Sequence, residues 1–120
     1  MAKYVDGFVI PIPKGKVDDY RKMARKAGKV WREHGALEYR ECVAEDVQPG
    51  ELTSFPQSVQ LKRGETVVFA WIVYKSRAHR DRVNDKVMSD PRLADMFDPK
   101  GNPFDMKRMV YGGFDVVVDL

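Results

Sequence analysis

The chain has 120 residues, of which 43% are hydrophobic and 32% charged, and its formal net charge is +3. This length and balance are typical of one soluble globular domain spanning residues 1–120, and they exclude a disordered chain or two independent domains. No apolar run approaches the roughly 20 residues that cross a bilayer, so no membrane partner is expected. The N-terminal stretch is a poor export signal and Cys42 is the single cysteine, which together indicate a reducing, cytoplasmic location.

Positive charge is concentrated between Lys16 and Glu33, where seven residues are basic and three are acidic. A basic helix surface can bind nucleic acids or other anions. Aromatic side chains do not alternate with these charges, however, so we interpret the surface as a solvated helix face. Nucleic-acid binding through this first helix remains the less favoured alternative.

The first half of the chain predicts a strand, a helix and a second strand. Residues 3–13 alternate with apolar side chains on both faces, which indicates a sheet that is covered on both sides. Residues 16–34 carry an apolar stripe at spacings of three and four, typical of a helix, and Gly35 is a natural stop. Residues 36–47 predict the second strand. The segment 48–64 is rich in proline and glycine, and it is long enough to act as a flap or arm.

The second half also predicts a strand, a helix and a strand. Residues 65–75, ETVVFAWIVYK, form the strongest predicted strand, and its two apolar faces indicate a central position. Ser76 is a predicted cap for a helix that runs to about Met88. A short helix is expected to restart at Pro91, and residues 109–119 are the last predicted strand.

The element order, βαββαβ, predicts a ferredoxin-like antiparallel α+β sheet with both helices on one face. The other face would also be apolar, and a patch of that size is rarely left exposed on a monomer. We therefore expect a homodimer formed through this sheet face, which is the arrangement of a dimeric α+β barrel.

The last predicted strand contains the adjacent pair Gly112 and Gly113. Glycines weaken a strand, so the pair predicts a bulge or the close approach of another group. Tyr111 and Phe114 flank the pair and are three residues apart, whereas the aromatics of the RNA-recognition signature are two apart on one strand face. RNA binding by this strand is therefore disfavoured.

Three segments, WREHGALEYRE, GETVVFAWIVYKSRAHRDRVNDKVMSDPRL and PFDMKRMVYGGFDVV, resemble the bacterial DUF1428 family of YbaA-like proteins. The resemblance extends over residues 3–118 and implies the dimeric α+β barrel superfamily. No biochemical function is assigned to that family, so the resemblance supplies no catalytic residue. The superfamily includes cofactor-independent monooxygenases, haem-degrading enzymes, isomerases and small stress proteins, so the fold selects no single activity.

We predict a pocket between helices and sheet, with His79 as a candidate general base because it shares the sheet-facing line of its helix. Each candidate also has a structural interpretation as a core, capping or ion-pairing residue. Two distant histidines and one cysteine give no metal signature, and no phosphate-binding loop is present, so no metal or cofactor is expected. The other candidate ligand-binding residues are Trp31, His34, Trp71, Asn84, Arg108 and Tyr111.

These observations favour a protein that binds a small organic molecule. Two alternatives remain open. The protein could transform the molecule, as a cofactor-independent monooxygenase or isomerase does, or it could be a non-catalytic ligand-binding or stress-response protein.

Overall fold

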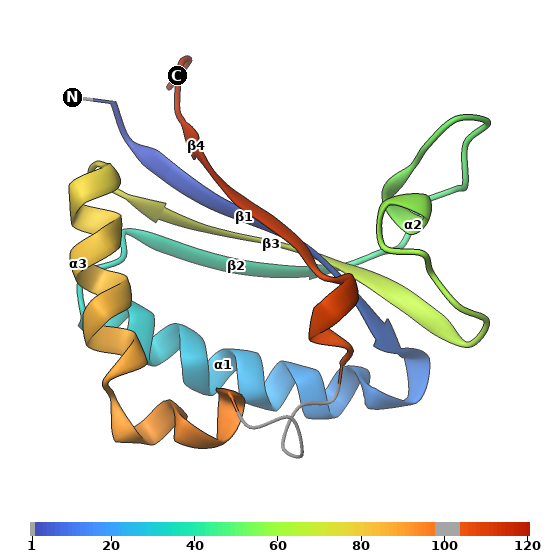
Figure 1. The fold of residues 1–120 in the computed structure, drawn as a ribbon, viewed down its shortest axis with the longest axis horizontal. Coiled ribbons are helices and arrows are strands. Elements are labelled where there is room, and N and C mark those ends of the chain that lie inside the picture. Colours follow the sequence, from blue (N-terminus) through green and yellow to red (C-terminus); the bar gives the residue numbers. More distant parts are fainter. Residues whose placement is uncertain (1, 98–103) are drawn as a thin grey trace.

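The computed structural model describes residues 2–97 and 104–120. Four strands form one antiparallel sheet in the order β2-β3-β1-β4. The strands are β1 (Tyr4–Pro13), β2 (Glu38–Val43), β3 (Glu65–Tyr74) and β4 (Val110–Asp115). Helices α1 (Val17–Glu33) and α3 (Arg77–Met88) lie on the same side of the sheet (Figure 1). The predicted ferredoxin-like α+β fold is thereby confirmed.

The helix boundaries follow local sequence signals. A short 3-10 turn, η1 (Lys14–Lys16), leads into α1, which ends before Gly35. Gly35 has a φ of +119°, a backbone conformation that only glycine adopts without strain. At the start of α3, the hydroxyl of Ser76 accepts a hydrogen bond from the backbone N–H of His79 at 3.1 Å, as predicted for a cap.

The core lies between the sheet and the two helices. Alternate residues of the central strands, such as Ile10 opposite Val68, point toward the helices. Helix α1 contributes buried residues that include Ala27 and Val30, and α3 contributes Val83. A further 3-10 segment, η2 (Pro91–Phe97), follows α3 and adds the buried Leu93 to the same core. No helix within the described parts of the chain combines the length and apolar character needed to cross a membrane.

The opposite face of the sheet, which we call the outer face, is also apolar. Its exposed residues include Phe69, Val110 and Phe114, which are 37%, 46% and 63% exposed. Trp71 lies beside Phe69 on this face, with ring centroids 5.7 Å apart. The prediction of apolar side chains on both faces of the sheet is therefore confirmed.

The segment 48–64 contains one short helix, α2 (Phe55–Ser58), that the sequence analysis missed. The hydroxyl of Ser54 caps it by accepting a hydrogen bond from the N–H of Gln57 at 3.2 Å. Phe55 packs edge-to-face on Phe69, with ring centroids 5.7 Å apart. The segment projects beyond the sheet in Figure 1.

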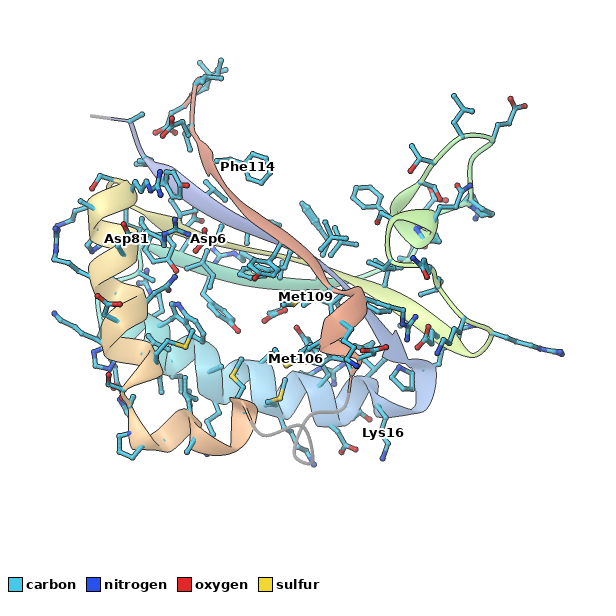
Figure 2. All side chains as sticks on the ribbon, in the orientation of Figure 1. Asp6, Lys16, Asp81, Met106, Met109 and Phe114 are labelled. Atoms are coloured by element: carbon cyan, nitrogen blue, oxygen red, sulfur yellow. The ribbon has the colours of Figure 1, made fainter. Side chains whose placement is uncertain are left out.

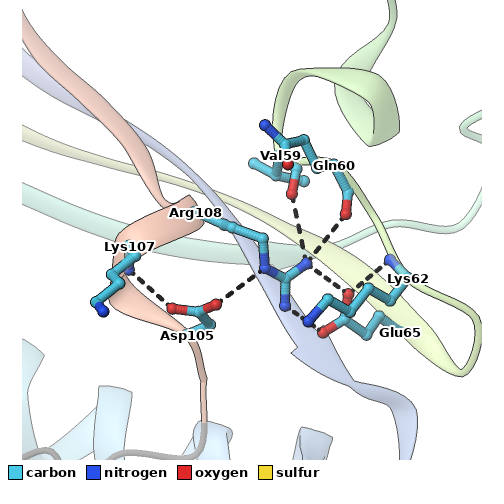
Figure 3. A network of polar contacts seen from close by, with 7 residues as sticks. All are labelled: Val59, Gln60, Lys62, Glu65, Asp105, Lys107 and Arg108. Atoms are coloured by element: carbon cyan, nitrogen blue, oxygen red, sulfur yellow. Dashed lines mark hydrogen bonds and ion pairs between the residues drawn. The ribbon is translucent and has the colours of Figure 1, made fainter.

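Arg108 holds this segment to the start of β4 (Figure 3). It ends the 3-10 turn η4 (Met106–Arg108), and its guanidinium binds both carboxylate oxygens of Glu65 at 2.8 and 2.7 Å. The same guanidinium donates to the carbonyl oxygens of Val59 and Gln60. Arg108 is therefore engaged in joining three segments, and this pairing holds the pKa of Glu65 below its usual value.

The glycine pair of β4 sits in an unbroken ladder. The register runs continuously from Val9 opposite Val110 to Tyr4 opposite Asp115, so the predicted bulge is wrong. The predicted close approach is confirmed, because a Cβ atom on Gly113 would lie 2.6 Å from Cε2 of Tyr4. β4 also ends at Asp115 rather than near residue 119, since its partner β1 begins at Tyr4.

Candidate functional site

A cavity of about 480 Å³ lies between the sheet and the helices. Pockets of 300–1,000 Å³ commonly hold small organic ligands. Phe8, Ile10, Ala70 and Ile72 of the sheet form part of an apolar lining. Met106 and Met109 line the cavity where η4 leads into β4 (Figure 2). The methionines that line the cavity are Met23, Met88, Met96, Met106 and Met109.

One polar centre of the cavity is the carboxyl group of Glu41, on β2. It faces the helices, because its partner across the sheet is the buried Ala70. The hydroxyl of Tyr20 donates to Oε1 of Glu41 at 2.7 Å, and the hydroxyl of Tyr39 donates to Oε2 at 2.6 Å. These distances are in the range of hydrogen bonds from a hydroxyl to an ionised carboxylate.

Burial governs the ionisation of this centre. It raises the pKa of Glu41, and the hydrogen bonds from Tyr39 and Tyr20 oppose that rise. Burial and the adjacent Glu41 raise the pKa of both tyrosines well above their usual value, so both hydroxyls stay protonated and act as donors. No basic side chain in the described residues forms an ion pair with Glu41.

We expect Glu41→Gln to stabilise the unliganded protein at neutral pH, because burial makes the ionised form of Glu41 unfavourable in the folded state. A carboxyl group whose pKa is raised in the folded state favours folding below its unfolded pKa, and this contribution is lost as pH rises through the folded pKa. The stability difference between variant and wild type should therefore be largest at neutral pH and shrink as the solution is acidified. Chemical denaturation across this pH range measures it, and a variant that is less stable at neutral pH would contradict the expectation.

The second polar centre is the buried carboxylate of Asp6, on β1. Arg80 of α3 donates to its Oδ1 at 2.8 Å, and the side chain of Asn84 also hydrogen-bonds this carboxylate. Burial nevertheless raises the pKa of Asp6. The amide oxygen of Asn84 accepts from Nε1 of Trp31 and from the hydroxyl of Tyr74, each at 3.2 Å. Asp6 thus belongs to a connected network with its own counter-charge.

Three of the predicted site residues line the cavity: Trp31, Asn84 and Tyr111. Trp31 and Asn84 meet in the hydrogen bond described above. Tyr111 lies at the opening of the cavity, where it is 68% exposed and stacks on Phe8 with ring centroids 6.3 Å apart.

His79 lies outside the lining of this cavity. It is in the first turn of α3, one turn before Val83. Its Nδ1 accepts the backbone N–H of Lys75 at 2.9 Å, and its ring packs edge-to-face against Tyr74. Burial and nearby cationic side chains lower its pKa. The prediction that Val83 and Val87 face the sheet was correct, but their side of the helix does not bring the imidazole of His79 to the cavity.

The remaining predicted residues are not part of the cavity lining. Nε2 of His34 lies 2.9 Å from Oδ2 of Asp90, just beyond the end of α1. Trp71 is on the outer face of the sheet, and Arg108 binds Glu65. No group of three or more potential ligands is placed to hold a metal ion within residues 2–97 and 104–120.

The sequence analysis missed the polar residues that define the cavity. The available signal was the two-residue period of the strands. Asp6 follows Tyr4 and precedes Phe8 on the helix-facing side of β1, and Glu41 follows Tyr39 in the same way on β2. A carboxyl group on the buried face of a strand is a candidate functional residue.

The sequence profile of a family described as a protein of unknown function, DUF1428, matches residues 3–106. The chain belongs to the DUF1428 family. The uncharacterized protein YbaA of Escherichia coli K12 is 49% identical over 117 residues, covering 98% of each chain. The same name, identity and coverage apply to the relative in Shigella flexneri.

Solved structures share the fold of this DUF1428 protein. An uncharacterized NIPSNAP domain protein from Burkholderia xenovorans aligns with a TM-score of 0.53 and 16% identity, covering 92% of this chain and 91% of that one. A NIPSNAP family protein of unknown function from Agrobacterium tumefaciens aligns with a TM-score of 0.56 and 14% identity, covering 96% and 88%. At these identities the likeness concerns the fold alone.

Proposed function

We propose that this DUF1428 protein binds a small, largely apolar organic molecule in the cavity between its helices and its sheet. The observation that carries the proposal is the cavity of about 480 Å³, whose apolar lining includes two hydrogen-bonding centres, the buried Asp6 and the half-buried Glu41. This combination is typical of small-molecule sites, where apolar area supplies affinity and a few polar groups fix orientation. The methionines suit the task, because their flexible side chains adapt to the shape of a ligand.

The proposed assembly is a homodimer in which two copies pack through their outer faces. The face exposes Phe69, Val110 and Phe114, and the charged residues that share it are at its margins, Glu65 at the start of β3 and Glu38 and Arg40 on the edge strand β2. A two-fold contact places the same patch on both copies, so an apolar surface is complementary to itself. The cavity is on the other side of the sheet and stays open. A monomer in native mass spectrometry would contradict this assembly.

A proton-transfer enzyme is the second candidate function, and Glu41 is the observation that favours it. Its raised pKa and its two tyrosine partners are features of a general acid or base. A cofactor-independent monooxygenase or isomerase needs such a group next to its substrate. Recovery of a bound ligand unchanged after incubation with oxygen would favour the non-catalytic alternative.

We expect 2-naphthalenemethanol, a neutral two-ring molecule, to bind in this cavity. The protein is labelled with ¹³C at the methionine methyl groups, and the titration is followed by NMR. Signals of the cavity methionines, such as Met23 and Met109, should shift in a saturable manner. Unshifted signals at the highest soluble concentration would contradict the proposed site.

Two variants of adjacent β3 residues locate the binding. Ala70→Leu adds volume inside the cavity and should weaken binding by roughly tenfold or more. Trp71→Phe is the matched control, because Trp71 faces the opposite side of the same strand. Equal affinity of the two variants would place the ligand elsewhere.

A further inference from the structure

The two carboxyl groups of the cavity lining, those of Asp6 and Glu41, differ in their pairing. Asp6 is paired with Arg80 at 2.8 Å, and these two charges compensate each other. Arg40, at the edge of the cavity, pairs with the exposed Glu38 at 3.5 Å. Glu41 is the carboxyl group of the lining that has no cationic partner in the described residues.

The hydrogen bonds of Glu41 leave room for a further donor. Each carboxylate oxygen accepts one hydroxyl, from Tyr20 or from Tyr39, whereas a carboxylate offers about four acceptor sites. Two hydroxyl groups supply no positive charge. The carboxylate of Glu41 is therefore partly desolvated, and its oxygens can still accept hydrogen bonds from a ligand in the cavity.

Aromatic rings surround this carboxylate. Phe104 packs edge-to-face on Tyr20, with ring centroids 5.6 Å apart, and Trp31 lies 6.0 Å from the ring of Tyr39. All four rings belong to residues of the cavity lining. Faces of such rings attract ammonium groups, most strongly where water is excluded. Cationic side chains also lie nearby, because Arg21, Arg25, Lys29, Arg32 and Arg40 line an open groove that includes Tyr39 and Glu41. None of them forms an ion pair with Glu41 in the described residues.

We propose that the ligand of this cavity carries a positively charged nitrogen, as an amine or a quaternary ammonium group, and that this nitrogen binds against the carboxylate of Glu41. The apolar body of the ligand then contacts the methionines and the sheet. The inference rests on the proposed function, since it names the chemical class of molecule that the same cavity binds. An anionic ligand is disfavoured, because it would bring a second negative charge next to Glu41.

Three probes with one ring system test the sign of the charge. They are 2-naphthylmethylamine, which is cationic at pH 7, the neutral 2-naphthalenemethanol and the anionic 2-naphthoate. Each is titrated into the full chain, with the methionine methyl signals as the readout. The amine should bind roughly tenfold or more tightly than the alcohol, and the naphthoate more weakly than the alcohol.

Glu41→Gln should remove this discrimination, leaving the amine and the alcohol within about twofold of each other. Glu38→Gln is the control for net charge, because it removes one negative charge from the other face of the same strand. It is a stringent control, since it also releases Arg40 from its ion pair. That control should keep the preference for the amine. Tyr20→Phe retains the carboxylate with one donor fewer, so the preference should persist or grow, and its loss would overturn the inference.

The outcomes separate the two proposals. If the amine and the alcohol bind the wild-type protein equally well, the ligand class is wrong and the small-molecule cavity stands. If Glu38→Gln abolishes the preference as fully as Glu41→Gln, the effect comes from net charge and the assignment to Glu41 is wrong. If none of the three probes shifts a methionine signal, both proposals fall.

Discussion

Replacing Asp6 with alanine is expected to lower the free energy of unfolding by about 3 kcal/mol. The Asp6 side chain is 8% exposed and that of Arg80 is 19% exposed, so the pair is largely shielded from water. Removing one partner leaves the other as a poorly compensated charge in the interior. The hydrogen bond from Asn84 loses its acceptor at the same time. Chemical denaturation of the full chain measures the loss.

Asp81→Ala is the control for this prediction. Asp81 binds the same guanidinium at 2.8 Å, but its side chain is 57% exposed (Figure 2). An exposed ion pair contributes about 0–1 kcal/mol, so the control should cost little. If the two variants lose a similar free energy of unfolding, burial does not determine how much each ion pair contributes to stability. The Asp6→Ala variant should also disturb the cavity, because Arg80 and Asn84 line it.

The two-residue period of β1 and β3 was enough to predict the sheet. Both strands carry apolar residues on both faces, and both occupy the centre of the observed order. The two strands pair from Tyr4 opposite Tyr74 to Pro13 opposite Glu65. In this register, the side chains predicted to share a face in each strand lie on the same side of the sheet. Alternation is a local property of an extended chain, so it can be recognised without knowledge of the partner strand.

The candidate site was harder to predict, because its contacts join residues that are distant in sequence. Asp6 meets Arg80 across 74 positions, and Tyr20 meets Glu41 across 21. Such pairs depend on strand register and on the position of each helix over the sheet, which the local pattern does not determine. The His79 prediction shows the same limit. The prediction that one side of α3 faces the sheet was correct for Val83 and Val87. His79, in the first turn, instead accepts the backbone N–H of Lys75, just after β3.

The role of Gly28 also depends on a residue that is distant in sequence, Tyr39. Gly28 is a buried residue inside α1, where glycine is less favourable than alanine by about 1 kcal/mol. The ring of Tyr39 packs directly over it. A Cβ atom on Gly28 would lie 2.6 Å from Cδ1 and 2.7 Å from Cε1 of that ring, well inside contact distance. The glycine thus allows Tyr39 to reach the position from which its hydroxyl binds Glu41.

Two effects of opposite sign therefore decide the outcome of Gly28→Ala. Helix propensity alone predicts that the variant is more stable by about 1 kcal/mol. Overpacking typically costs about 1–3 kcal/mol, and here the displaced ring also loses its hydrogen bond to Glu41. We expect the second effect to dominate, with a net loss of about 1–2 kcal/mol in the free energy of unfolding.

The control for this variant is Gly15→Ala, since no atom lies within 4 Å of a Cβ at that position. Its stability should stay close to that of the wild type. In the double variant Gly28→Ala/Tyr39→Leu the crowding ring is gone, so the alanine should cost less than it does alone. A more stable Gly28→Ala variant would show that helix propensity dominates and that the ring of Tyr39 moves without cost. Weakened amine binding by Gly28→Ala would connect this helix contact to the carboxylate of Glu41, because Tyr39 is the residue that touches both.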